Sequence, residues 1–269
     1  MKEKKKEFLK LLKQKITPAT GCTEPIAVAY AVAAVKDQIE GNLVSIHVQV
    51  DSNIYKNGLM VTIPGTTEKG LVAAAAFGFV AGDIKKSFRV IEGLTDKDIV
   101  RARDLIEQKK IELSLKRDCA GLDIEVTLLT DKEKVRVNIL DNHLNIVNIE
   151  KIDLNSQFKP LIREKQNANS SNYQIHEYTL EDFLQFSNET PLEDLMFLED
   201  GIKMNMEIAQ EGLTIKSGVG AKFTEMIKEG VMSDNMVTRA QVLCAAASEA
   251  RMSGSKLPVM STAGSGNHG

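Results

Sequence analysis

The stretch Thr17-Pro-Ala-Thr-Gly-Cys-Thr-Glu-Pro25 stands directly before the apolar run Ile26-Ala-Val-Ala-Tyr-Ala-Val-Ala-Ala-Val35. Proline suits the first position of a helix, where its missing N–H costs nothing, so Pro25 predicts a helix over residues 25–39. The many alanines of this helix permit close packing and predict burial on most of its surface. The rest of the chain is expected to be organised around this turn and helix.

Cys22 is predicted to lie just outside the positive end of that helix. Such a position lowers the pKa of a thiol and favours the thiolate, which attacks carbon, exchanges with disulfides or binds iron. Thr23 or Glu24 can cap or complement the free amides that begin the helix. The alternative is that Cys22 is a small buried residue filling a tight turn, and the cysteine alone does not separate the two interpretations.

Composition indicates an ordinary protein with a large core, because 43% of the 269 residues are hydrophobic and 26% are charged. The net charge of −3 excludes a global basic field, so neither a nucleic-acid nor a membrane partner is predicted. Lysines interrupt the first apolar residues, which argues against a signal peptide, and the expected location is the cytoplasm. The three cysteines are far apart, which argues against a disulfide framework and against a local zinc site.

Residues 1–42 are predicted to form two helices, 3–16 and 25–39, that carry the Cys22 turn and pack with a later helical domain. Residues 43–154 are predicted to form an α+β domain, because apolar and polar residues alternate with a period of two in several segments. Its expected elements are a hairpin of strands 43–50 and 59–63 around a polar turn at 51–58, helices 71–81 and 95–110, a short strand 111–115, and a meander of strands 122–128, 134–140 and 144–149.

Residues 155–178 are polar and without periodicity, which predicts a linker. Residues 179–269 are expected to begin a helical domain with helices 180–187, 191–209, 217–229 and 234–251. The last helix has a stripe at Val237-x-x-Ala-x-Val-x-x-Ala that predicts burial, with Cys244 as a small core residue, and Cys119 is interpreted in the same way. The predicted class is α+β, with N-terminal helices plus antiparallel strands and packed helices, followed by a helical domain that is truncated.

The tail from Pro258 to Gly269 is a loop rich in glycine and hydroxyl groups. Its glycines let backbone amides converge, and Ser265 and Asn267 add donors, so a carboxylate could rest there. A plain flexible tail is the alternative. Loops of this kind usually deliver their amides from the start of a helix, and none follows here, so we expect the chain to be an N-terminal portion of a longer protein.

Four motifs resemble one family in order and spacing, and together they span nearly the whole chain. This is the L-cysteine desulfidase family (UPF0597), which is related to the alpha chain of iron-sulfur L-serine dehydratase. The resemblance implies a β-elimination on a small amino acid, assisted by an oxygen-sensitive [4Fe-4S] cluster and without pyridoxal phosphate. The motifs are Gly21-Cys-Thr-Glu-Pro25, Ser52-Asn-Ile-Tyr-Lys-Asn-Gly58 followed by Ile63-Pro-Gly65, Ala246-Ala-Ser-Glu-Ala-Arg-Met-Ser-Gly254, and Gly264-Ser-Gly-Asn-His-Gly269.

The resemblance also implies roles for individual residues. Cys22 would be one cluster ligand, and the others would lie beyond this chain or come from a partner chain. Three thiolates would leave one iron open as a Lewis acid for the departing thiol or hydroxyl group. Lys56 or His268 would serve as the base that removes the α-proton. The implied substrate contacts are Thr23, Glu24, Asn53 and Asn57, with Ser265, Gly266 and Asn267 at the carboxylate.

Two other classes of function remain open from the sequence. One is a non-catalytic protein that binds a small amino acid or a partner subunit, and the other is a redox-sensing thiol protein built on Cys22. Within the enzyme hypothesis, L-cysteine and L-serine differ in one atom, and the sequence does not separate them as substrates. The alanine-rich helices are compatible with a homodimer.

Overall fold

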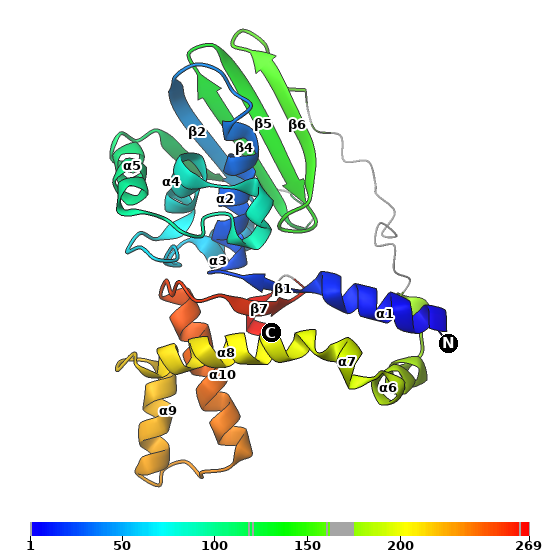
Figure 1. Ribbon diagram of the computed structural model, residues 1–269. Helices are drawn as coiled ribbons and strands as arrows, with labels where there is room; N and C mark the ends of the chain where they lie inside the picture. Colours follow the sequence, from blue (N-terminus) through cyan, green and yellow to red (C-terminus); the bar gives the residue numbers. More distant parts are fainter. Residues whose placement is uncertain are drawn as a thin grey trace.

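The computed structural model describes residues 2–117, 119, 121–159, 161, 175–263 and 265–268. The expected α+β class is confirmed, and Figure 1 shows a sheet with helices above a group of helices. The predicted central helix is α2 (Thr23–Lys36), and it is buried on nearly all sides. It packs against α4 (Gly70–Ala81) so closely that a Cβ on Gly78 would lie 2.5 Å from the carbonyl oxygen of Ala29.

The main sheet has five strands in the order β3-β2-β4-β5-β6. The short strand β3 pairs with β2 in parallel, and the remaining pairs are antiparallel, which confirms the predicted meander. Helices α2, α4 and α5 lie on one face of the sheet (Figure 1), where they cover the buried side chains of the alternating strands. The elements are β2 (Leu43–Val50), η1 (Ile84–Arg89), α5 (Asp96–Glu107), β3 (Ile111–Leu115), β4 (Asp123–Thr130), β5 (Glu133–Leu140) and β6 (Ile146–Asp153).

The predicted hairpin of strands 43–50 and 59–63 is wrong, because the polar turn between them is the helix α3 (Ser52–Gly58). One carboxylate oxygen of Asp51 caps this helix by accepting from the N–H groups of Asn53 and Ile54 at 2.8 and 3.2 Å. Its other oxygen accepts from the N–H of Asp123 at 2.9 Å. Since β3 and β4 occupy both edges of β2, no edge remains for a hairpin partner.

A small second sheet joins the two ends of the chain. Strand β1 (Ile16–Ala19) pairs antiparallel with β7 (Val259–Thr262), and the Ser261 hydroxyl donates to the carbonyl oxygen of Thr17 at 2.7 Å. The segment that precedes Cys22 therefore lies beside the segment that precedes the final loop. This pairing could not be read from local pattern, since its strands are short and far apart in sequence.

The predicted helices of the last third are confirmed, but the one expected over 191–209 is divided near Met196. Helices α8 and α10 pack in close contact, because Gly212 faces the backbone of Ala246 without a side chain between them. None of the described helices is both long and apolar enough to cross a lipid bilayer. The elements are η2 (Ile175–Glu177), α6 (Leu180–Glu189), α7 (Leu192–Leu195), α8 (Phe197–Leu213), α9 (Val219–Lys228), α10 (Met236–Met252) and η3 (Gly266–His268).

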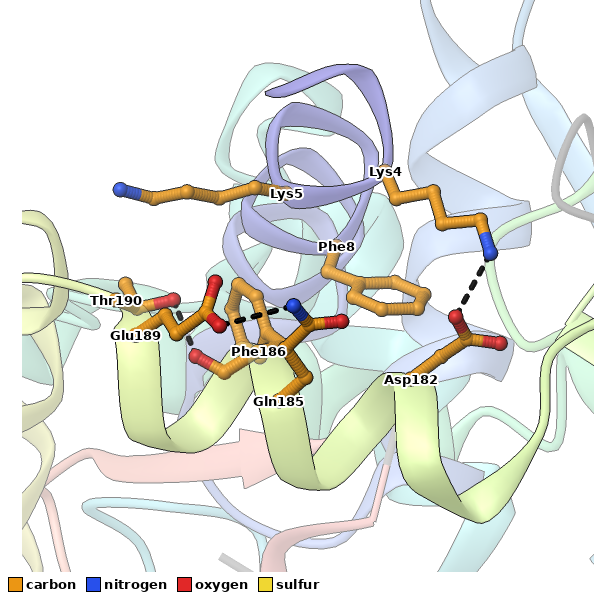
Figure 2. Close-up of a pocket in the computed structure, with 8 residues that line it drawn as sticks. All are labelled: Lys4, Lys5, Phe8, Asp182, Gln185, Phe186, Glu189 and Thr190. Atoms are coloured by element: carbon orange, nitrogen blue, oxygen red, sulfur yellow. Dashed lines mark hydrogen bonds and ion pairs between the residues drawn. The ribbon is translucent and has the colours of Figure 1, made fainter. Parts of the chain in front are cut away.

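The first helix, α1 (Lys2–Lys15), packs on α6. Figure 2 shows Phe8 of α1 lying against Phe186 of α6, with ring centroids 5.3 Å apart, and Lys4 forming an ion pair with Asp182 at 2.7 Å. Most of the predicted linker between them, residue 160 and residues 162–174, lies outside the described residues. The aromatic contact thus joins α1 to the helical part of the chain.

The predicted buried stripe on the last helix is wrong for the first half of α10. Val237 is 62% exposed and Cys244 is exposed, whereas Val242, Ala246 and Ala250 are buried. The reason is that α8 and α9 pack against only part of the surface of α10. Cys244 is therefore a surface residue and not the small core residue that the pattern predicted.

Candidate functional site

The turn that carries Cys22 is shaped by a glycine in the left-handed region. Gly21 has φ +72°, and a Cβ at this position would lie 2.5 Å from Cγ of Pro64. Cys22 follows as the N-cap residue of α2 with only 5% of its surface exposed. The predicted position of the cysteine at the start of the helix is confirmed.

Glu24 connects the predicted substrate residues around this turn. Its carboxylate accepts from the Cys22 thiol at 2.8 Å and from the Thr23 hydroxyl at 3.1 Å. It also accepts from Nδ2 of Asn57 at 3.1 Å, which connects α3 to the start of α2. The structure therefore brings Cys22, Thr23, Glu24 and Asn57 together, although Asn57 belongs to a motif more than thirty residues away in the sequence.

The pKa of the Cys22 thiol is shifted in the direction opposite to the expected one. Burial, followed by the negative charge of Glu24 beside the sulfur, raises the pKa of Cys22 to about 12. Burial alone would raise the pKa of Glu24, but its hydrogen bonds, with that of Cys22 the largest, bring this pKa below its usual value. The expectation of a low-pKa thiolate is wrong for this chain, and a redox sensor that needs such a thiolate is not supported.

We expect the thiol of Cys244 to be alkylated by iodoacetamide at pH 8 at least about 100-fold faster than that of Cys22. The reason is that a pKa raised from 9.0 to about 12 lowers the thiolate fraction of Cys22, and burial limits access further. Peptide mass spectrometry over time measures both rates, and unfolding in urea should make them similar. Equal rates in the folded protein would contradict the assigned hydrogen bond to Glu24.

Arg251, on α10, connects the Cys22 turn to the final loop. It is only 3% exposed, its Nε donates to the carbonyl oxygen of Gly21 at 2.8 Å, and its Nη1 donates to Oδ1 of Asn267 at 2.8 Å. A Cβ on Gly266 would lie 2.7 Å from Cζ of Arg251, so the loop passes directly against the guanidinium group. Sequence reasoning included this arginine in a motif but assigned it no role.

The loop that contains Thr62 and Gly65 of the second motif also contacts the end of α10. The N–H of Gly65 donates to the carbonyl oxygen of Gly254 at 2.9 Å, and the N–H of Thr62 donates to that of Met252 at 3.3 Å. Gly254 itself has φ +92°, and a Cβ there would meet Thr62 at 2.7 Å. All four motifs therefore meet around Gly21 and the end of α10, which the sequence alone could not establish.

The remaining predicted residues lie at different positions around this centre. Asn53 and Lys56 are exposed on α3, the helix that carries Asn57. Ser265 uses its backbone in a paired bridge with Thr262, so only its hydroxyl remains for a ligand. His268 belongs to η3, but its side chain lies outside the described residues.

His143 is a neighbour of the site to which the sequence analysis assigned no role. It lies between β5 and β6, and burial lowers the pKa of its imidazole, while the negative charges of Glu24 and Asp51 oppose that shift. The carboxylates of Glu24 and Asp51 are therefore close enough to His143 to act on it electrostatically. No local pattern could have revealed this, since the residues come from separate elements.

A groove of about 810 Å³ runs from Arg251 along α8 and α10. Ser248, Arg251 and Asn267 form its polar end, and the Ser248 hydroxyl donates to Oδ1 of Asn267 at 3.2 Å. Most of the remaining wall is apolar. These further residues include Leu198, Ile202, Met206, Leu243, Val259 and Met260, together with the exposed Cys244.

The donor set of the described residues does not fit a complete [4Fe-4S] site. Among them, no three histidine, cysteine or acidic side chains lie close enough to bind one metal ion. Cys244 lies about two helical turns from Arg251, roughly 10 Å along α10, and the Cys119 thiol contacts the carbonyl oxygen of Lys116 at 3.2 Å. Cys22 is thus the single cysteine at the centre of the motifs.

The fold and the site define an α+β protein with a buried thiol–carboxylate pair where its sheet domain meets its helical part. A model of the serine dehydratase alpha chain matches residues 85–269, and the chain belongs to this family. UPF0597 proteins of Clostridium tetani and Caldanaerobacter subterraneus are similar to it, with 41% and 40% identity over 97% and 96% of this chain. A UPF0597 protein of Klebsiella pneumoniae is 33% identical over 97% of the chain.

This chain covers 61% of the Clostridium relative and 60% of the Caldanaerobacter relative. It therefore spans about three fifths of the length of these curated relatives. No solved structure matches the chain. The resemblance noted from the four motifs is confirmed at the level of the family.

Proposed function

We propose that this chain is part of a lyase that eliminates the β-substituent of L-cysteine, with L-serine as the alternative substrate, without pyridoxal phosphate. The family supports a serine dehydratase-like protein, and the choice of L-cysteine as substrate is our finer proposal. The observation that carries it is Arg251, which joins the Cys22 turn to the glycine loop at Asn267. Removal of the α-proton and departure of sulfide or hydroxide would leave aminoacrylate, which tautomerises and is hydrolysed to pyruvate and ammonia.

The residues of this chain suit the handling of a small zwitterion. The Glu24 carboxylate, with its lowered pKa, could attract the substrate ammonium group, and Asn57 keeps that carboxylate in position. The Oδ1 atom of Asn267 accepts from two donors, which leaves its Nδ2 amide to donate to a carboxylate. Lys56 and His268 stay our candidates for the base that removes the α-proton.

We also propose that an iron–sulfur cluster assists the reaction, with Cys22 as one ligand. The support is the family resemblance and the position of Cys22, while the donor set argues that other thiolates come from further polypeptide. A bound cluster would supply a Lewis acid for the leaving group. The relatives are longer than this chain, so further polypeptide could supply the missing ligands.

The test is an anaerobic assay of the purified chain with L-cysteine and with L-serine. The chain is reconstituted with iron and sulfide, alone and mixed with a polypeptide comprising the unmatched part of the Clostridium tetani relative. We expect pyruvate, measured by coupling to lactate dehydrogenase, with sulfide from L-cysteine, in the mixture and not in the chain alone.

Hydroxylamine, which attacks pyridoxal phosphate, should leave the rate unchanged, and exposure to air should abolish it. Absence of pyruvate from both amino acids in both preparations would contradict the proposed reaction. Amino-acid binding without any pyruvate would instead favour the non-catalytic alternative. Its support is that the described residues contain one central cysteine and no complete metal site.

A further inference from the structure

The guanidinium group of Arg251 is a buried positive charge that forms no ion pair with the described residues. No carboxylate among the described residues lies within ion-pair distance of it, although Arg251 is only 3% exposed. Its two hydrogen-bond acceptors, the carbonyl oxygen of Gly21 and Oδ1 of Asn267, are neutral. Burial has the larger effect and lowers the pKa of Arg251, whereas the nearby Glu24 carboxylate favours the charged guanidinium group. Because burial of a charge without an ion pair is unfavourable, this position suits an anion.

The surroundings of the guanidinium group suit a small anion in particular. Arg251 lines the polar end of the groove with Ser248 and Asn267, so a ligand in the groove can reach it. An arginine has five N–H donors in a planar fork, and two of them are used here, which leaves three for a ligand. A fork of this kind matches the two oxygens of a carboxylate.

We propose that Arg251 binds the α-carboxylate of the substrate, with the side-chain amide of Asn267 as a second donor. The inference deepens the proposed function and rests on it for the identity of the ligand. Because Nε of Arg251 is fixed on Gly21, a carboxylate on the same guanidinium group lies next to the turn that carries Cys22. The site then selects amino acids with a free carboxylate over amides of the same size.

The test is calorimetric binding of L-serine and L-serinamide to the 269-residue chain without added iron or sulfide. We expect the wild type to bind L-serine at least about 30-fold more tightly than L-serinamide, because only L-serine offers the negative charge. In Arg251→Gln the affinity for L-serine should fall by about 30-fold or more, while that for L-serinamide changes by less than about threefold.

Two further variants separate binding from structure. Arg239→Gln is the matched control, since Arg239 lies on the same helix, is exposed and pairs with Asp234 at 2.6 Å, and it should leave both affinities unchanged. Arg251→Lys retains a charge, so a preference for L-serine should persist at reduced affinity. The melting temperature of each variant verifies that it is folded.

Several results would overturn the inference. One is an equal loss of affinity for L-serine and L-serinamide in Arg251→Gln, which marks Arg251 as a purely structural link. Another is loss of the preference for L-serine over L-serinamide in Arg251→Lys. A third is that the wild type binds none of the three carboxylates L-serine, L-cysteine and L-lactate. Carboxylate-selective binding without pyruvate formation would support the role of Arg251 and refute the proposed reaction instead.

Discussion

Cys22→Ser should lower the rate of pyruvate formation from L-cysteine and L-serine by about 100-fold or more in the reconstituted preparation. Loss of a group that acts on the reacting atoms or ligates a metal typically has an effect of this size. Serine is close in shape and keeps a donor for Glu24, so the hydrogen bond at the start of α2 can persist. The melting temperature should therefore change little.

Cys119→Ser and Cys244→Ser are the matched controls, because both cysteines lie outside the group around Glu24. Each should retain more than half of the wild-type rate. A Cys22→Ser variant that keeps a similar rate would refute the central role of this sulfur. A variant that fails only because it is unfolded would be recognised by its circular dichroism spectrum.

Gly78→Ala should destabilise the protein by about 2 kcal/mol, because a clash with backbone costs about 3 kcal/mol, the upper end of the usual range for overpacking, and helix propensity returns about 1 kcal/mol. A Cβ at Gly78 would meet the backbone of Ala29 at 2.5 Å for its oxygen and 2.8 Å for its Cα. The helices α2 and α4 cannot move apart without opening the core over the sheet. The midpoint of urea unfolding, followed by circular dichroism, measures the change.

Gly201→Ala is the control for this prediction, since Gly201 is also a buried helical glycine. Its added Cβ would meet Cγ of Met260 at 3.0 Å, and methionine is flexible enough to move. We expect a change of less than about 0.5 kcal/mol, because propensity and packing offset one another. Equal effects of the two substitutions would show that the approach of α2 and α4 is looser than the structure indicates.

Local pattern predicted most of the helices and strands correctly. The alternation of residues 122–149 predicted the meander, and the helix predicted over 180–187 is α6, which begins with a capping box formed by Thr179 and Asp182. These signals are local because they depend on backbone geometry and on neighbours a few residues away. They are therefore readable without knowledge of the fold.

The errors arose where a distant contact changed the outcome. Residues 51–58 became a helix because Asp51 is shared between the start of α3 and the N–H of Asp123 on β4. Cys244 proved exposed because only part of α10 is covered by its neighbours. In both cases the composition of the segment allowed two structures, and packing selected one.

The pKa of Cys22 was likewise decided by packing in the folded chain. Its place at the start of α2 was predicted, and by itself that place lowers a thiol pKa. The burial of the sulfur and its contact with the Glu24 carboxylate act more strongly in the opposite direction, and the pKa rises to about 12. The net effect depends on burial, which is a property of the folded chain.

By itself the sequence determined most of the secondary structure, the family and most of the polar groups that surround the site, because these depend on local composition and on ordered motifs. Only the tertiary structure decided which of those groups meet. The pairing of β1 with β7 and the packing of α10 bring Arg251 between Gly21 and Asn267, residues separated by more than 200 positions. Such contacts depend on the closure of long loops and on shared burial, and no short stretch of sequence records them.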